Sequence, residues 1–343
     1  MIRPFEKGDE AQLNRLFKHV FDKDRSIEEF EWKYLKHPVK NNPWILVYEE
    51  DGAILGSIAL WVLDAYVKGE ERQIALRCDT MVSPEARGKG VYRQLNEAML
   101  ERAKQDGIVY LYGFPSEQAK GPLMKQTGGK HLGEVSRMVA IYEPVSILSG
   151  KLPLLKPFRL VDRIYRRRQT KVNRKFKSDI VEISLVDVFD QRVDELCEQT
   201  RNLSPVLVKR TKDYLNWRYA EHPIHDYQIL IAEKAGELIG YTILKTEPKN
   251  GFKAGAIVDM IALPDDEEVW KALAHQSVKQ LSDCALIQAW TIPETMFAQT
   301  LEKAGFFEKD QPMPLVGNLL EEQRKSIHHM NAFYITQGDV DSF

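Results

Sequence analysis

The chain has 343 residues, of which 43% are hydrophobic and 29% are charged, so it carries enough apolar material for two globular cores. Its formal net charge of -2 gives no overall attraction to nucleic acid, and no nucleic-acid partner is expected. No run approaches the roughly 18 apolar residues that span a bilayer, and no signal peptide is evident. The three isolated cysteines fit neither a disulfide framework nor a metal site. We therefore expect a cytoplasmic two-domain protein without a metal.

The first half of the chain alternates between strand and helix patterns. Apolar residues recur at helical spacing between residues 11 and 21, and Ser26, followed by two glutamates, predicts the start of a second helix that ends before Pro38. Asp51-Gly52 is typical of a hairpin turn. The expected strands are 2–5, 44–49, 54–67, 73–82 and 109–114, and the expected helices are 11–21, 26–37, 91–103 and 122–126.

The junction between the strand at 73–82 and the following helix carries small and cationic residues. These are Arg87, Gly88, Lys89 and Gly90. The first N–H groups of a helix have no partner within the helix, and glycine lets a phosphate approach them closely. The pattern predicts an anion site for a ligand with a pyrophosphate. The third glycine of a dinucleotide fingerprint and the Gly-Lys-Ser/Thr of a P-loop are both missing.

Residues 151–177 form a basic segment, with eleven Lys or Arg and a single acid, Asp162, interleaved with apolar residues. Such a segment can lie on an anionic membrane or hold an acidic substrate. It can also be an interdomain helix whose apolar face packs on one domain while its cations stay in water, and we favour this second interpretation. We therefore treat residues 147–179 as a basic connector.

The second half of the chain repeats the first. Trp32-x-Tyr-x-x-His-Pro38 recurs 185 residues later as Trp217-x-Tyr-x-x-His-Pro223, and Asp79 is matched by Asp259. We interpret the two motifs as packing residues. The expected elements of this half are strands at 181–185, 228–233, 238–246, 254–262 and 285–291, helices at 188–199, 209–220, 269–280, 294–304 and 321–330, and an apolar piece at 333–336. The repeat predicts an α/β (α+β) protein with tandem domains at 1–146 and 180–343.

The order of these elements, with Val82-x-Pro84 leading into Arg87-x-x-Gly90, resembles the GCN5-related N-acetyltransferase (GNAT) superfamily in both halves. In that family an Arg/Gln-x-x-Gly-x-Gly/Ala loop binds the pyrophosphate of coenzyme A. The last small residue of that signature is Tyr92 here. The resemblance implies two tandem GNAT-like domains, each a mixed, mostly antiparallel sheet flanked by helices.

The resemblance also implies an acetyl-CoA or other acyl-CoA cosubstrate, bound by the first half. The implied contact residues are Met81, Val82, Arg87, Gly88, Lys89, Gly90, Val91, Tyr92 and Ser116. In the second half the loop is replaced by four acids, Asp265 to Glu268. Because four carboxylates repel a pyrophosphate and the glycines are missing, we expect this second domain to be degenerate.

By resemblance, an acceptor amine attacks the thioester directly in a ternary complex, which calls for a base and an acid. Asp79 is the first candidate for the base, since partial burial beside the thioester would raise its pKa, although its counterpart Asp259 suggests a structural task. Weaker candidates are Glu117 and Glu134. In many members of the family a tyrosine acts as the acid, but the nearby position here is Met124. Tyr92 is the first candidate to act as the acid instead, and Tyr110 and Tyr112 are others.

The predicted function is therefore an acyl-CoA-dependent N-acyltransferase that moves an acetyl or acyl group to the primary amine of a small molecule or peptide. The alternative is a non-catalytic acyl-CoA-binding or interaction protein, and it is motivated by Met124. Amino sugars, polyamines and protein amines all present a suitable acceptor group.

Overall fold

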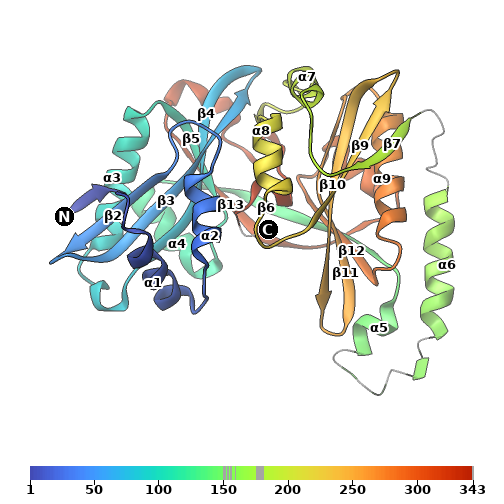
Figure 1. The fold of residues 1–343 in the computed structure, drawn as a ribbon, viewed down its shortest axis with the longest axis horizontal. Coiled ribbons are helices and arrows are strands. Elements are labelled where there is room, and N and C mark those ends of the chain that lie inside the picture. Colours follow the sequence, from blue (N-terminus) through green and yellow to red (C-terminus); the bar gives the residue numbers. More distant parts are fainter. Residues whose placement is uncertain (150–151, 153, 155–156, 159, 175–180, 342–343) are drawn as a thin grey trace.

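The computed structural model describes the chain except for residues 150–151, 153, 155–156, 159, 175–180 and 342–343. Two halves of similar build lie side by side (Figure 1). The first half contains β1 (Ile2–Pro4), α1 (Glu10–Phe21), α2 (Ile27–Phe30), β2 (Trp44–Glu50), β3 (Ala53–Val67), β4 (Glu70–Val82), α3 (Val91–Gln105), β5 (Ile108–Gly113), α4 (Glu117–Thr127) and β6 (Lys130–Ile141).

Two helices, α5 (Pro144–Ser149) and α6 (Leu160–Arg174), follow this half. The second half then contains β7 (Glu182–Val186), α7 (Arg192–Gln199), β8 (Val206–Val208), α8 (Lys212–Leu215), β9 (Tyr227–Lys234), β10 (Glu237–Lys249), β11 (Phe252–Ala262), α9 (Glu267–Gln280), β12 (Leu286–Thr291), α10 (Met296–Lys303) and β13 (Phe307–Leu319). The predicted order is confirmed from β1 to α4 and from β7 to α10, apart from the short β8, and β6, β8 and β13 lie outside the ranges expected for strands.

One continuous sheet joins the halves. Its strand order is β1-β2-β3-β4-β5-β13-β6-β12-β11-β10-β9-β7, with β8 paired to β3. Strand β13, from the second half, lies antiparallel between β5 and β6, and β6, from the first half, pairs with β12. The last strand of each half thus pairs with strands of the other half. The pairs β4–β5 and β11–β12 are parallel and the remaining pairs are antiparallel, which confirms the predicted mixed, mostly antiparallel sheet.

Helices cover both faces of the sheet in the first half. Helix α3 packs on one face, where Leu95 and Met99 are buried against Leu60 of β3. Helices α1 and α2 pack on the opposite face, which belongs to a larger core shared by the two halves. The loop before α3 therefore lies on one side of the sheet, and the N-terminal helices lie on the other.

The repeated tryptophan motifs meet at the centre of the molecule. Trp32 Nε1 donates a hydrogen bond to the Trp217 carbonyl (2.7 Å), and Trp217 Nε1 donates one to the Trp32 carbonyl (2.9 Å). The two indoles are stacked, with ring centroids 5.0 Å apart. His37 lies against Trp217 and His222 against Trp32, both at 4.2 Å between ring centroids. This reciprocal pattern places a local pseudo-twofold axis between the tryptophans and confirms that the two motifs are packing residues.

Two expectations from the sequence are wrong in detail. The expected helix at 321–330 consists of short 3-10 turns at Glu322–Ile327 and Met330–Ala332, because the chain kinks at Arg324. The apolar residues of the basic connector were expected to pack on a domain, but most of those that the structure describes are exposed, while Ile147 and Tyr165 are half-buried. None of the helices in the described ranges combines the length and apolar character that crossing a membrane requires.

Ser26→Ala is expected to lower the free energy of unfolding by about 1 kcal/mol, because the Ser26 hydroxyl caps α2 by accepting a hydrogen bond from the Glu29 N–H (3.0 Å). Thr211 caps α8 in the same way. Thr211→Ala should therefore cause a similar loss, and Ser26→Asn should retain most of the stability. Urea denaturation measures all three, and unchanged stability in both alanine variants would contradict the capping role.

Candidate functional site

The loop between β4 and α3, residues 87–90, has the backbone of an anion site, and we call it the cradle loop. Gly88 and Gly90 have φ values of 82° and 77°, which only glycine adopts without strain. Gly90 stands at the N-cap of α3, and no side chain caps the first N–H groups of this helix. The neighbouring Arg87 is exposed, and Lys89 is held by Glu50 at 3.2 Å. A pyrophosphate can therefore approach free N–H groups at the positive end of the helix dipole.

Strand β4 is open on one side next to this loop. It pairs with β5 over residues 73–76, and beyond Leu76 its pairing continues with β3 alone. Since no described strand pairs with residues 77–82 on the β5 side, their backbone N–H and C=O groups on that side are available to a ligand. Met81 and Val82, which the resemblance implies as contacts of pantetheine, lie in this open stretch.

Three adjoining cavities follow the open part of β4. The first, the cradle cavity of about 490 Å³, is lined by Arg87, Gly88 and Gly90 among others. The second, the slot cavity of about 310 Å³, shares Thr80 and Tyr92 with the first. The third, the central pocket of about 390 Å³, shares Phe21, Asp79 and Asp341 with the second and contains residues of both halves, such as Trp32 and His222. These three cavities lead from the cradle loop to the junction of the two halves.

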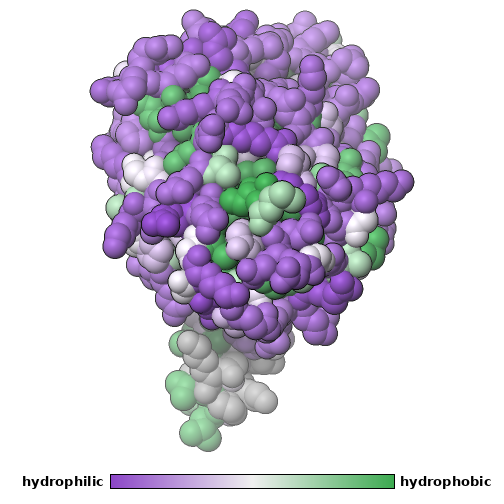
Figure 2. All heavy atoms as spheres, turned by 90° about the vertical axis from the view of Figure 1, so that its left-hand side faces the viewer, coloured by the Kyte–Doolittle hydropathy of each residue, from purple (hydrophilic) through white to green (hydrophobic). Residues whose placement is uncertain are grey.

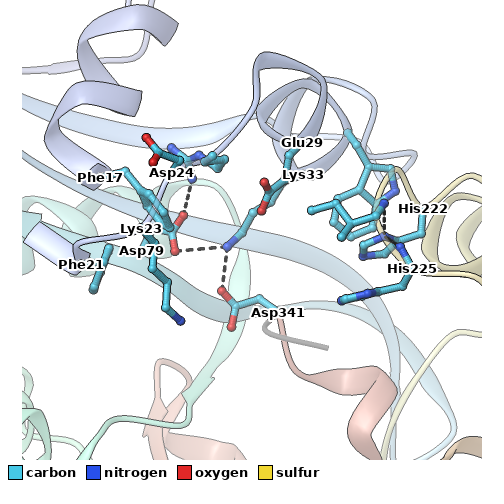
Figure 3. A pocket seen from close by; sticks show the side chains of 13 residues that line it. Phe17, Phe21, Lys23, Asp24, Glu29, Lys33, Asp79, His222, His225 and Asp341 are labelled. Atoms are coloured by element: carbon cyan, nitrogen blue, oxygen red, sulfur yellow. Dashed lines mark hydrogen bonds and ion pairs between the residues drawn. The ribbon is translucent and has the colours of Figure 1, made fainter. Parts of the chain in front are cut away.

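Asp79 stands where the slot cavity meets the central pocket (Figure 3). Its carboxylate accepts hydrogen bonds from Arg25 (2.6 Å), Lys33 (3.1 Å) and the Tyr34 hydroxyl. Burial alone would raise the pKa of Asp79, but Lys33 and Arg25 outweigh burial and lower it. The expectation of a raised pKa is therefore wrong. A carboxylate with a lowered pKa and three donors is a weak proton acceptor.

Asp341 reaches the same place from the end of the second half. Figure 3 shows the Lys33 ammonium between Asp79 and Asp341, and its distance to the Asp341 carboxylate is 2.9 Å. Burial would lower the pKa of Lys33, but Asp341 and Asp79 outweigh it and keep this lysine charged. The Asp341 side chain is 21% exposed and accepts a hydrogen bond from Lys33. It therefore retains lone pairs that face the two cavities.

The far wall of the central pocket is aromatic. His222 packs against Trp32 and stacks on His225 with ring centroids 4.7 Å apart. Burial and the neighbouring Arg218 lower the pKa of His222 to about 3, so its imidazole is neutral. Phe17 and Phe21 line the opposite side, where the Arg25 guanidinium lies 4.3 Å from the Phe17 ring centroid. A molecule in this pocket would thus meet rings on two sides and carboxylates near Asp79.

The other predicted site residues divide into two groups. Tyr92 is half-buried and lines both the cradle and slot cavities, and Ser116 lines the slot cavity with no side-chain capping bond to α4. Tyr110 and Tyr112 are buried in the core, where burial raises the pKa of both. Glu117 and Glu134 are paired with Lys120. These last four residues line none of the three cavities.

The corresponding region of the second half is filled by protein. The C-terminal segment covers the open side of β11, where the Tyr334 hydroxyl donates to the Met260 carbonyl and Thr336 donates to Asp259 (3.1 Å). Trp270, which aligns with Tyr92, is fully buried. The cavity beside Gln337 holds about 20 Å³, against about 310 Å³ for the slot cavity. The cavity beside Gln337 is therefore far too small for a long ligand.

Sequence reasoning missed Arg25, Lys33 and Asp341. The first two had a signal in the repeat, since a basic residue, Arg210 or Arg218, follows each of them 185 residues later. Arg210 lies 3.5 Å from Asp259 in the second half, as Arg25 lies 2.6 Å from Asp79 in the first. Asp341 had no such signal, because it reaches the cavities through a loop at the end of the chain. Among the described residues, no group of three or more His, Cys, Asp or Glu side chains could hold a metal ion.

Comparison with known proteins agrees with this geometry. Residues 1–126 match the family model described as Acetyltransferase (GNAT) domain. A search of curated proteins gave no significant match.

Solved structures resemble nearly the whole chain. A GCN5-related N-acetyltransferase from Anabaena variabilis superposes with a TM-score of 0.69 at 12% identity, over 96% of this chain and 75% of that one. A probable N-acyltransferase of unknown function from Enterococcus faecalis gives a TM-score of 0.68 at 14% identity, over 94% and 73%. A GCN5-related N-acetyltransferase from Kribbella flavida gives 0.64 at 13% identity, over 96% and 73%. At these identities the likeness establishes the fold.

The family match therefore covers the half that carries the cradle loop, the open strand and the cavities, and the shared fold extends over both halves. Residues 1–126 thus match the acetyltransferase (GNAT) domain family, and the chain shares its fold with solved GCN5-related N-acetyltransferases.

Proposed function

We propose that this protein is an acyl-CoA-dependent N-acyltransferase whose first half binds the cosubstrate. The observation that carries the proposal is the series of three cavities along the open part of β4. This series of cavities is long enough to suit an acyl-CoA whose pyrophosphate lies at the cradle loop and whose thioester lies near Asp79. The filled counterpart in the second half supports a single acyl-CoA site per chain.

The residues present fit coenzyme A. Gly88 and Gly90 keep the loop backbone open to a pyrophosphate, and the free edge of Met81 and Val82 suits the amides of pantetheine. Arg87, Lys89 and Val91 complete the loop, and Ser116 lies across the slot cavity. The cosubstrate supplies a thioester, whose carbonyl carbon is the electrophile.

In the proposed reaction the acceptor nitrogen bonds to the carbonyl carbon, the carbon–sulfur bond breaks, and the thiolate takes a proton. The acceptor enters through the central pocket, where the aromatic wall orients it. Asp341 receives the proton that the amine loses, because it keeps free lone pairs at the boundary of the slot cavity. Asp79, first predicted as the base, holds Lys33 and thereby Asp341 in place. Tyr92 is the proposed proton donor to the thiolate, since it borders the slot cavity.

Incubation with acetyl-CoA and a panel of primary amines tests the proposal. Amine-dependent release of free thiol is the expected result. Binding of CoA without thiol release for any amine in a broad panel would instead support the alternative, a non-catalytic acyl-CoA-binding protein.

Asp341→Asn is expected to lower kcat by about 10²-fold or more, because the amide cannot take a proton. Its Kd for CoA should stay unchanged, since Asp341 lies beyond the cradle loop. The steady-state rates are compared with those of Asp213→Asn, which removes an exposed carboxylate that lines none of the three cavities. Equal rates for wild type and Asp341→Asn would remove Asp341 from the mechanism.

A further inference from the structure

Helix α6 turns its polar side toward the protein. Asp162 is 5% exposed and accepts hydrogen bonds from the N–H groups of Val145 (2.8 Å) and Ser146 (3.0 Å) at the start of α5. One turn later, Arg166 donates to the Glu143 carboxylate (2.7 Å) and to the Cys284 carbonyl (3.0 Å). Figure 1 shows α6 beside α9 at the outer edge of the second half. Ionic and capping contacts thus fix which side of α6 faces inward.

The outer side of α6 carries apolar residues in its first turns. Leu160 is 68% exposed and Ile164 is 70% exposed, while Val161 between them is 47% exposed. Positions 160, 161 and 164 are spaced as neighbours on one helical face. An ordinary surface helix buries its apolar side chains, whereas α6 leaves these three in water beside exposed cations.

The apolar surface continues into the described residues before α6. Leu154 and Phe158 are 89% and 60% exposed. Figure 2 shows some hydrophobic side chains at the lower end of the molecule, below a body that is mostly hydrophilic. Since a folded protein rarely leaves contiguous apolar surface in water, this face has the character of a docking surface.

The charge of the segment indicates what covers it. Residues 151–177 carry eleven Lys or Arg, and their one acid, Asp162, is engaged at the start of α5. Arg163 and Arg167 are exposed beside the apolar side chains. A second copy of the chain would bring these like charges together across a twofold contact. An anionic bilayer instead accepts the apolar side chains below its headgroups and pairs the cations with lipid phosphates.

We propose that the outer face of α6 docks on an anionic membrane surface. Leu160, Val161 and Ile164 enter the interface, and Arg163 and Arg167 lie at headgroup level. The helix lies flat, because its inner contacts to α5 and to the Cys284 carbonyl hold it along the second half. The proposal does not depend on the acyltransferase activity, since lipid binding is measured without CoA.

Flotation of the full chain with vesicles tests the proposal. Vesicles of phosphatidylcholine and phosphatidylglycerol should carry the protein upward, vesicles of phosphatidylcholine alone should carry at least about tenfold less, and high salt should reverse the binding. Val161→Gln with Ile164→Gln should reduce the partition coefficient by about tenfold or more, because both apolar side chains are lost. Arg163→Gln with Arg167→Gln should reduce it by about tenfold.

The matched control is Leu185→Gln with Val188→Gln, which removes two exposed apolar side chains (58% and 59%) outside α6 and should leave binding unchanged. Unfolding temperatures show that each variant is folded. Wild-type protein that ignores both vesicle types, or binds both equally, would overturn the proposal. So would a wild-type dimer in solution that Val161→Gln with Ile164→Gln converts to a monomer, since the face would then cover a second copy.

Discussion

In Asp79→Asn, the free energy of unfolding is expected to fall by about 3–5 kcal/mol, because the change leaves the buried cation Arg25 without its compensating charge and leaves Lys33 with Asp341 alone. The Arg25 side chain is 2% exposed and cannot turn to water. Denaturant unfolding monitored by tryptophan fluorescence gives the value. Asp283→Asn is the matched control, because it breaks an aspartate–lysine pair that is largely exposed, and it should cost about 0–1 kcal/mol.

The same cluster sets a pH dependence. Because the pKa of Asp79 is lower in the folded protein than in the unfolded chain, its contribution to stability is fully present above the unfolded value of about 3.9. The contribution is lost as the pH falls through the lowered folded value. Acid titration of wild type should therefore show a steeper loss of stability than titration of Asp79→Asn. Parallel acid limbs in the two proteins would show that Asp79 is not held ionised by its neighbours.

Gly90→Glu is expected to abolish the thermal stabilisation that CoA gives, with Kd raised by about a hundredfold or more, equivalent to about 2.7 kcal/mol. The new carboxylate would lie at the start of α3, where it repels a pyrophosphate and occupies free N–H groups. It also strains the backbone, since φ at this position is 77°.

A matched glycine separates these two effects. Gly107 has a φ of 79° and open space where a side chain would be added, but it follows α3 instead of preceding it. Gly107→Glu should therefore lose a similar amount of intrinsic stability and keep its full response to CoA. If Gly90→Glu still responds to CoA, the cosubstrate does not use this loop.

The order of the elements could be predicted from the sequence because each is specified locally. Helical spacing in residues 11–21, the Ser26 cap and the Asp51-Gly52 turn each act within a few residues. The exchange of β6 and β13 could not be predicted, since Val316 pairs with Gly113 across some two hundred residues and nothing in either strand marks the partner.

The cradle loop was predictable for the same local reason, because glycines at a strand–helix junction carry their own conformational preference. The lowered pKa of Asp79 could not be predicted, since it depends on Arg25 and Lys33. These two residues reach Asp79 from the α1–α2 side of the sheet only once the fold is formed. The orientation of α6 was also hidden. Periodicity shows that a helix has two faces, and the contacts of Asp162 and Arg166 decide which of them turns inward.

The pairing of β13 with β5, across the two halves, has a consequence for biosynthesis. Strand β5 acquires its second neighbour from residues 307–319, so the half that carries the cradle loop cannot complete its sheet until nearly the whole chain has left the ribosome. Such distant pairing slows folding and leaves the edge of β5 open in the meantime. An N-terminal fragment that ends before β13 would lack this neighbour. The two halves are therefore expected to fold as one unit, in which the second half supplies the strand that completes the sheet of the first.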